Sequence, residues 1–133
     1  MASIFTKIIN REIPAFIVAE DDSNLAFLDI NPISKGHTLV VPKKEVNYLF
    51  DLDDDTYLSL QQFTKKVALA VKGVIPCLRI GTAVVGLEVP HTHIHLIPLN
   101  SMADFSFSNP KLSMGKEELE EIAKKINSAF QNL

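Results

Sequence analysis

Three of the four histidines in the chain lie within five residues, in the run P-H-T-H-I-H-L-I at positions 90–97. Side chains alternate across a β-strand with a period of two, so a strand here would point His91, His93 and His95 to the same face. Successive rings would lie about 6.6 Å apart, given a rise of about 3.3 Å per residue. The other face would carry apolar side chains into the core. The sequence therefore predicts a strand over residues 91–97 that presents a row of imidazoles.

An imidazole row suits three kinds of chemistry. Neutral imidazoles can bind a metal ion, hydrogen-bond a phosphate group, or attack phosphorus as nucleophiles. A plain solvated strand face and a zinc site completed by His37 are alternatives that the pattern does not favour. Three rings along one strand stretch too far to share one ion, and no acidic residue is evidently placed to orient metal-bound imidazoles. We therefore expect no metal ion and no cofactor, and the spacing alone leaves open whether the row binds a phosphate group or attacks phosphorus.

Composition limits the classes of protein that remain. The 133 residues suit one domain, and the apolar and charged fractions, 47% and 22%, are ordinary for a soluble globular protein. The net charge of −3 argues against binding of long nucleic acid, which needs a basic face, but not against binding of a single nucleotide. A lone cysteine, Cys77, is consistent with a reducing compartment. No apolar run long enough for a signal peptide or a membrane span is visible, so a cytoplasmic protein is expected.

Hydrophobic periodicity outlines the elements that must position the histidines. Apolar residues recur at offsets of three and four from Leu60 to Val71, which predicts a helix near residues 54–72 with Gly73 just past its end. The expected strands cover residues 15–20, 25–30, 37–41, 78–85 and 91–97, and further helices are expected after an N-cap at Ser3 and over residues 119–130. The fold class predicted is α+β, with an antiparallel sheet of about five strands, a central helix and a C-terminal helix.

The histidine run also fits the pattern His-φ-His-φ-His-φ-φ, where φ is an apolar residue and Thr92 takes one such position. Other segments accompany it in order: I-F-T-K-I-I-N-R-E-I-P-A (4–15), E-D-D (20–22), A-F-L-D-I-N-P (26–32) and G-H-T-L-V-V-P-K-K (36–44). Together they resemble the Hint branch of the histidine-triad (HIT) family over roughly residues 4–98. Residues 1–133 would then form a single HIT-like domain, with residues 99–133 as an extension.

The resemblance implies a function. It suggests an enzyme that binds a purine nucleotide or nucleotidyl conjugate and hydrolyses a bond at the α-phosphorus, as in nucleoside phosphoramidates. The reaction would pass through a nucleotidyl-histidine intermediate. It also implies a homodimer, for which the helix near residues 54–72 is the expected contact. A nucleotide-binding protein with weak or no catalytic activity is the alternative.

The resemblance assigns roles to all four histidines. His93 matches the nucleophile, for which a neutral imidazole is competent near neutral pH. His91 and His95 match the flanking triad members, which contact the phosphate and orient the nucleophile. His37 matches a fourth, supporting histidine. One ring nitrogen of His93 must be held by an acceptor so that the other presents its lone pair, and a backbone carbonyl is the expected acceptor.

The resemblance also predicts a nucleoside site. Asp29 matches the residue that accepts hydrogen bonds from the ribose hydroxyls, and a carboxylate can accept from both. The residues that match the base slot are Phe5, Ile8, Phe27 and Ile30. Ordinary core packing is the alternative for these four side chains.

The sequence departs from the family pattern at positions that bear on phosphate binding. Glu45 follows V-P-K-K where the family often has histidine. Gly81 or Thr82 lies near an expected asparagine, and Leu87 replaces an expected glutamine. Loss of an amide donor to a phosphate costs on the order of 1.5–3 kcal/mol, which is about tenfold or more in rate if the bond strengthens in the transition state. These departures are what favour the alternative of a weakened enzyme or one with an altered substrate preference.

Overall fold

Five antiparallel strands form one sheet, in the order β1-β2-β3-β5-β4, in the computed structural model, which describes residues 2–133. The elements are α1 (Ile4–Ile9), β1 (Ile17–Glu20), β2 (Asn24–Leu28), β3 (Thr38–Pro42), the 3-10 turn η1 (Leu49–Asp51), α2 (Asp54–Val74), β4 (Arg79–Ala83), β5 (Ile94–Leu99), the 3-10 turn η2 (Met102–Asp104) and α3 (Lys116–Gln131). The α+β prediction, with a five-stranded sheet, a central helix and a C-terminal helix, is confirmed.

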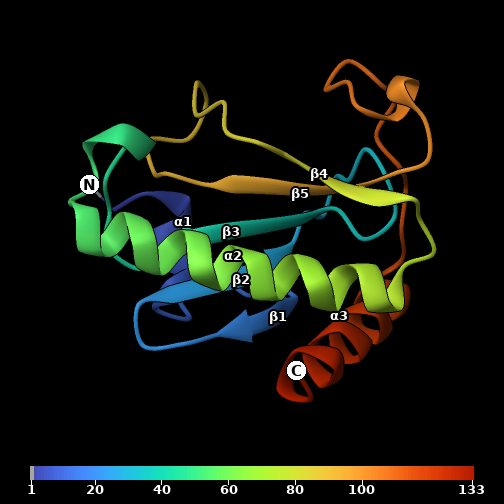
Figure 1. Ribbon diagram of the computed structural model, residues 1–133, viewed down its shortest axis with the longest axis horizontal. Helices are drawn as coiled ribbons and strands as arrows, with labels where there is room; N and C mark the ends of the chain where they lie inside the picture. Colours follow the sequence, from blue (N-terminus) through green and yellow to red (C-terminus); the bar gives the residue numbers. More distant parts are fainter. Residues whose placement is uncertain (1) are drawn as a thin grey trace.

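The two faces of the sheet are covered by different helices. Figure 1 shows α2 running across one face with α3 beside it, and α1 behind the sheet. Alternation along β2 feeds both layers: Ala26 and Leu28 enter the larger core with α2 and α3, whereas Leu25 and Phe27 pack with α1 in a smaller core. The sheet therefore separates two hydrophobic layers, and the side to which a residue points follows from its position along the strand.

The helix starts follow the predicted capping residues. Ser3 caps α1, and its side-chain oxygen accepts from the backbone N–H of Thr6. Asp53 caps α2 in the same way. The predicted end of α2 at Gly73 is wrong, because the helix continues to Val74. The backbone N–H of the next residue, Ile75, still donates to the carbonyl of Val71. Pro76, rather than the glycine, stops the helix, since proline offers no N–H to continue it.

The predicted strand over residues 91–97 is shifted: β5 begins at Ile94 and ends at Leu99. The ladder between β3 and β5 stops at the pair Val40–Ile94. Two residues further along, β3 reaches Pro42, which has no N–H to donate to the ladder. The chain before β5 bonds elsewhere, as the backbone N–H and the hydroxyl of Thr92 both donate to the carbonyl of Val46 at 2.8 and 2.7 Å.

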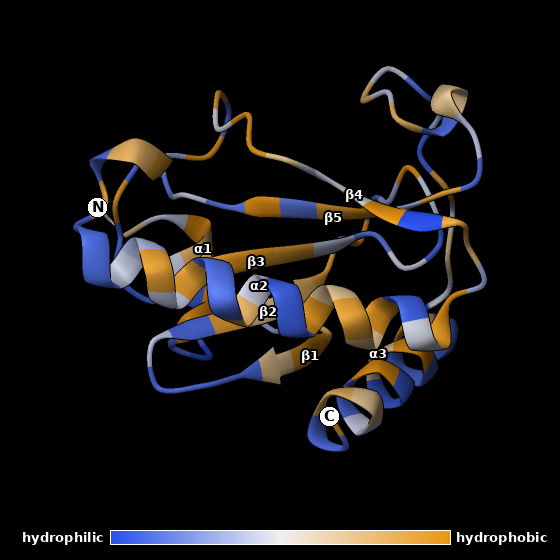
Figure 2. Cartoon of the chain, in the orientation of Figure 1, coloured by the Kyte–Doolittle hydropathy of each residue, from blue (hydrophilic) through white to orange (hydrophobic). Residues whose placement is uncertain are grey.

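Hydropathy follows the layers. Figure 2 shows that β3, at the centre of the sheet, is mostly hydrophobic, whereas α2 and α3 mix hydrophilic and hydrophobic residues along their lengths. Within residues 2–133, the helices all lack the combination of length and apolar character that crossing a bilayer requires.

Candidate active site

Strand alternation gathers polar side chains on the α1 face of the sheet, at one end of β2, β3 and β5. In β5, Ile94 and Leu96 belong to the core beneath α2, so His95 between them faces the other side. His37 immediately precedes β3, and its carbonyl accepts from the backbone N–H of Asp29 at 3.0 Å, one residue past the end of β2. Three side chains that are far apart in the sequence thereby meet.

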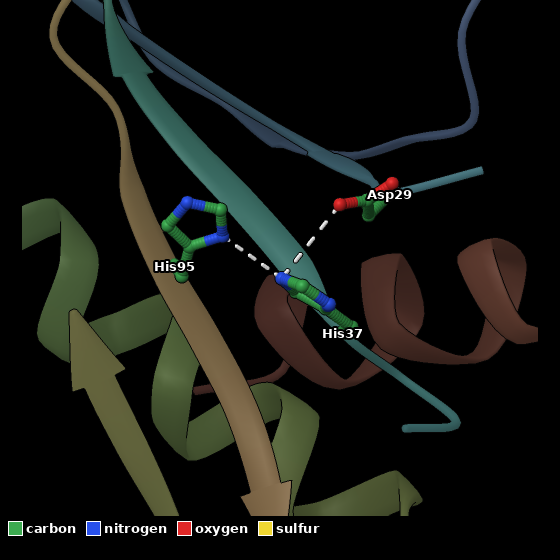
Figure 3. A group of neighbouring side chains, drawn as sticks. All are labelled: Asp29, His37 and His95. Atoms are coloured by element: carbon green, nitrogen blue, oxygen red, sulfur yellow. Dashed lines mark hydrogen bonds and ion pairs between the residues drawn. The ribbon is translucent and has the colours of Figure 1, made fainter. Parts of the chain in front are cut away.

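Asp29, His37 and His95 form a close cluster, with Asp29 and His95 on either side of the His37 ring (Figure 3). His37 Nε2 lies 2.9 Å from His95 Nδ1 and 3.7 Å from the Asp29 carboxylate. The backbone N–H of Ile33 donates to His37 Nδ1 at 3.3 Å. In a neutral His37 the proton is therefore on Nε2, which donates to His95 Nδ1. A neutral His95 then carries its own proton on Nε2, and this N–H can donate a hydrogen bond to a ligand.

The proton and the lone pair of the His93 ring are on the opposite nitrogens from those of His95. Its Nδ1 lies 2.8 Å from the carbonyl oxygen of His91. A carbonyl only accepts, so His93 Nδ1 carries a proton and a neutral ring has its lone pair on Nε2. The rings of His93 and His95 lie 5.1 Å apart, centroid to centroid. A potential nucleophile thus lies beside a potential hydrogen-bond donor, and the acceptor expected for His93 is a backbone carbonyl as predicted.

His91 is completely buried, at 0% exposure, and is not among the residues that line the cavity described below. Its Nε2 donates to the carbonyl of Pro42 at 2.8 Å, and its Nδ1 accepts from the hydroxyl of Ser3 at the same distance. The predicted row of three rings on one strand is therefore wrong, because His95 lies in β5 whereas His91 and His93 precede the strand. His91 contacts the site through its carbonyl.

A hydrogen-bond cluster at the start of α1 holds His91. The carboxylate of Glu45 accepts from the backbone N–H of Ser3 at 2.7 Å and from the hydroxyl of Thr6 at 2.6 Å. These bonds hold the pKa of Glu45 down at about 2. The sequence analysis identified Ser3 only as a helix cap and Glu45 only as a departure from the family pattern. No local signal predicts that both converge on a histidine more than 40 residues further along the chain.

The histidines border a cavity of about 550 Å³. Its lining includes His37, His93 and His95 together with Asp29, from the strand ends. The opposite wall comes from the segment 85–89, between β4 and β5, and from two residues of the connection between β5 and α3, Phe107 and Lys111. The Phe107 ring lies 4.8 Å from that of His95, edge to face. Neither Phe107 nor Lys111 was among the predicted site residues, since both lie in the extension that the resemblance does not cover.

The predicted base-slot residues divide between two places. Phe5, Ile8 and Phe27 are buried in the small core under α1, and Phe5 lies edge-on to His93 at 5.0 Å. Ile30 is 60% exposed and borders a different cavity of about 770 Å³, between β1 and α3. That cavity is larger, but it contains none of the histidines, so the smaller one is the candidate active site.

Burial keeps the rings of His37, His91 and His95 neutral near pH 7. It lowers the pKa of His95 to about 4, an effect that the neighbouring His37 and His93 reinforce. The pKa of His37 is lowered mainly by burial, against the opposing charge of Asp29. Burial also lowers the pKa of His91, although the Pro42 carbonyl and Glu45 oppose the shift. Neutral rings keep the lone pairs that nucleophilic attack and hydrogen-bond acceptance require.

Asp29, His37 and His95 could also supply ligands to a metal ion, since one ligand atom from each lies within 4.8 Å of the others. Two imidazoles and a carboxylate are typical of open zinc sites. The facing nitrogens of His37 and His95 already share a proton, which a metal ion would have to displace.

Comparison with known proteins places these features in context. Residues 10–102 match the family model described as HIT domain. An uncharacterized HIT-like protein of Borreliella burgdorferi is 39% identical, covering 93% of this chain and 95% of that protein. The adenosine 5'-monophosphoramidase hnt1 of Schizosaccharomyces pombe is 33% identical, covering 98% of this chain and all of that protein (100%). A crystal structure of a Hit-like protein from Bartonella henselae superposes with a TM-score of 0.82 at 37% identity, covering 96% of this chain and 95% of that one.

Proposed function

The chain belongs to the HIT family, and from that premise we propose that it is a purine nucleotide-binding hydrolase that cleaves a bond at the α-phosphorus. A nucleoside phosphoramidate is the substrate class that fits best, because a relative of full length is named as an adenosine 5'-monophosphoramidase. The observation that carries the proposal is the bond from His93 Nδ1 to the His91 carbonyl, which leaves the Nε2 lone pair of a cavity-lining ring free to attack phosphorus.

In the proposed reaction, His93 Nε2 forms a bond to the α-phosphorus as the bond from phosphorus to the leaving amine breaks. The nitrogen of the leaving amine takes a proton from solvent. Water then attacks the phosphorus of the nucleotidyl-histidine, the bond from phosphorus to His93 Nε2 breaks, and the proton that water loses returns to solvent. His95 Nε2–H donates to a phosphoryl oxygen, and His37 fixes the tautomer of His95. Asp29, which is partly exposed in the cavity, accepts from the ribose hydroxyls. Dividing one difficult displacement into two steps is the physical gain of such covalent catalysis.

A His93→Ala variant tests the proposal. Wild-type protein, quenched in acid during turnover of an adenosine 5'-phosphoramidate, should carry a nucleotidyl adduct on His93 that intact-mass spectrometry detects. The variant should form no adduct and lose turnover, and added imidazole should restore part of it by replacing the missing ring. Circular dichroism checks that the variant folds. Turnover of a folded His93→Ala variant at the wild-type rate would refute the nucleophile assignment.

The second candidate is a nucleotide-binding protein with weak activity. Leu87 stands where glutamine is expected, borders the cavity and is 88% exposed. Because its side chain is a hydrocarbon, it offers no hydrogen-bond donor to a phosphate there. A wild-type protein that binds AMP but turns over the phosphoramidate no faster than the His93→Ala variant would favour this second candidate.

We also propose that the protein is a homodimer. Two features support an interface: β4 is an edge strand, and exposed apolar residues lie on and just before α2. Tyr48 and Phe50 are 56% and 68% exposed, and Leu58 and Leu69 of α2 are 56% and 52% exposed. Sedimentation at micromolar concentration is the test, and a monomer would contradict the proposal.

A further inference from the structure

The candidate active site has little positive charge for an anionic substrate. A nucleoside monophosphate carries about 1.5 to 2 negative charges at pH 7. Two carboxylates, those of Asp29 and Glu88, already line the cavity. The pKa values of His37 and His95 are lowered, so these rings add no charge at neutral pH. Among the described residues that line the cavity, Lys111 is the one lysine or arginine.

Lys111 belongs to the connection between β5 and α3, beyond residues 10–102 that match the HIT domain. Figure 1 shows this orange segment leaving the end of the sheet and returning beside it before α3 begins. Two contacts fix its return. The backbone N–H of Leu112 donates to the carbonyl of Pro32 at 2.8 Å, and Phe107 lies against His95. The lysine is therefore delivered to the cavity by a tethered segment.

The side chain of Lys111 is available to a ligand. Its ammonium donates to the Phe107 carbonyl at 3.3 Å, a bond within its own loop, and the residue is exposed. An ammonium has three donors, so one bond to a carbonyl leaves others for a phosphate oxygen. Its charge reaches the histidines, because it contributes to the lowered pKa of both His37 and His95.

We propose that Lys111 binds the α-phosphate of the nucleotide in this cavity. The inference rests on the nucleotide function proposed above and assigns part of the binding to the C-terminal extension. The ammonium binds one nonbridging phosphoryl oxygen, while His95 Nε2–H donates to another. Lys111 thereby offsets the negative charge of Asp29 and Glu88 when an anion enters.

A charge-removal series tests this role. The variants are Lys111→Met, which keeps the length of the side chain without its charge, and Lys111→Arg, which keeps the charge. Lys125→Met is the matched control, because Lys125 is an exposed lysine of α3 and does not line the cavity. Calorimetry measures the Kd of each protein for AMP and for adenosine, which lacks the phosphate. Circular dichroism checks the fold.

We expect Lys111→Met to weaken AMP binding about tenfold, the loss typical of one charge-assisted hydrogen bond at a partly exposed site. Adenosine binding should be unchanged, Lys111→Arg should keep most of the AMP affinity, and Lys125→Met should match the wild type. The ratio of the Kd for AMP in Lys111→Met to that in the wild type should decrease as salt is added, because salt screens an exposed charge.

The outcomes separate this inference from the proposed function. Wild-type AMP affinity in Lys111→Met overturns the role of the lysine and leaves the hydrolase proposal standing. An equal loss of AMP and adenosine binding overturns it as well, since a structural defect would then explain the effect. A wild-type protein that binds no AMP overturns both.

Discussion

Removing the hydroxyl of Ser3 should destabilise the protein and slow catalysis through two neighbouring contacts. That hydroxyl donates to His91 Nδ1 at 2.8 Å, in a place where Ser3 is 7% exposed and His91 is 0% exposed. The same oxygen accepts from the backbone N–H of Thr6 at 3.0 Å and so caps α1. One atom thus links the first helix to the residue whose carbonyl orients His93.

Two substitutions separate the contacts. An unpaired buried polar atom costs about 1–3 kcal/mol, and both Ser3→Gly and Ser3→Ala leave His91 Nδ1 without its donor. Loss of a helix cap costs about 1 kcal/mol with alanine but only a few tenths with glycine. Ser3→Gly should therefore lower the free energy of unfolding by about 2 kcal/mol and Ser3→Ala by about 3 kcal/mol. Ser3→Thr keeps the hydroxyl and is the matched control.

Urea denaturation followed by circular dichroism measures the stabilities. Turnover of an adenosine 5'-phosphoramidate should fall about tenfold in Ser3→Gly, because a shift of the His91 carbonyl weakens the bond that orients His93. AMP affinity should be unchanged, since Ser3 does not line the cavity.

The reasoning fails if Ser3→Gly is as stable and as active as the wild type. The hydroxyl of Thr6, 3.4 Å from His91 Nδ1, could then have replaced that of Ser3. In that case the hydroxyl of Ser3 would have no specific role, because another hydroxyl of the same cluster would hold His91.

Two further predictions concern charge and phosphate contacts. The pKa values of His37, His91 and His95 are lowered in the folded state, so the unfolded chain binds more protons once the pH falls below about 6.5. The free energy of unfolding from urea denaturation should thus decrease between about pH 6.5 and 5, above the range of most carboxylates, and a flat profile there would contradict neutral histidines. Leu87→Gln should restore an amide donor at the cavity wall and raise turnover about tenfold. Val84→Gln is the control, because Val84 does not line the cavity, and it should leave turnover unchanged. Equal turnover rates for the two variants would show that no donor is missing.

Most of the fold could be predicted from local patterns. The apolar stripe from Leu60 to Val71 marks α2 because one face of that helix is buried on the sheet. The strands β2 and β3 are short apolar runs between turn residues, and both are entirely buried. The last two residues of α2 were missed, because Gly73 suggested an end where the chain has no need of a left-handed residue. Such local ambiguities shift boundaries without changing the fold.

The site was less predictable because it depends on contacts between distant segments. The bond between Ser3 and His91 joins residues 88 positions apart, and neither residue type by itself announces the pairing. Lys111 is the one lysine in the connection of residues 100–115, and it reaches the cavity through contacts with distant segments, from Leu112 to Pro32 and from Phe107 to His95. Local sequence spacing could not predict that His91 would leave the strand, since this depends on where Pro42 falls in the neighbouring strand.

The four histidines belong to two hydrogen-bond chains that reach the cavity with opposite polarity. In one chain, the N–H of Ile33 fixes His37, which donates to His95, so the chain ends in an N–H donor. In the other, the carbonyl of His91 accepts from His93, so that chain ends in a lone pair. A phosphoryl group needs both, because its oxygens accept hydrogen bonds while its phosphorus accepts a nucleophile. Each chain begins at a backbone group in a buried part of the fold, which explains how chemically identical rings can hold different tautomers about 5 Å apart.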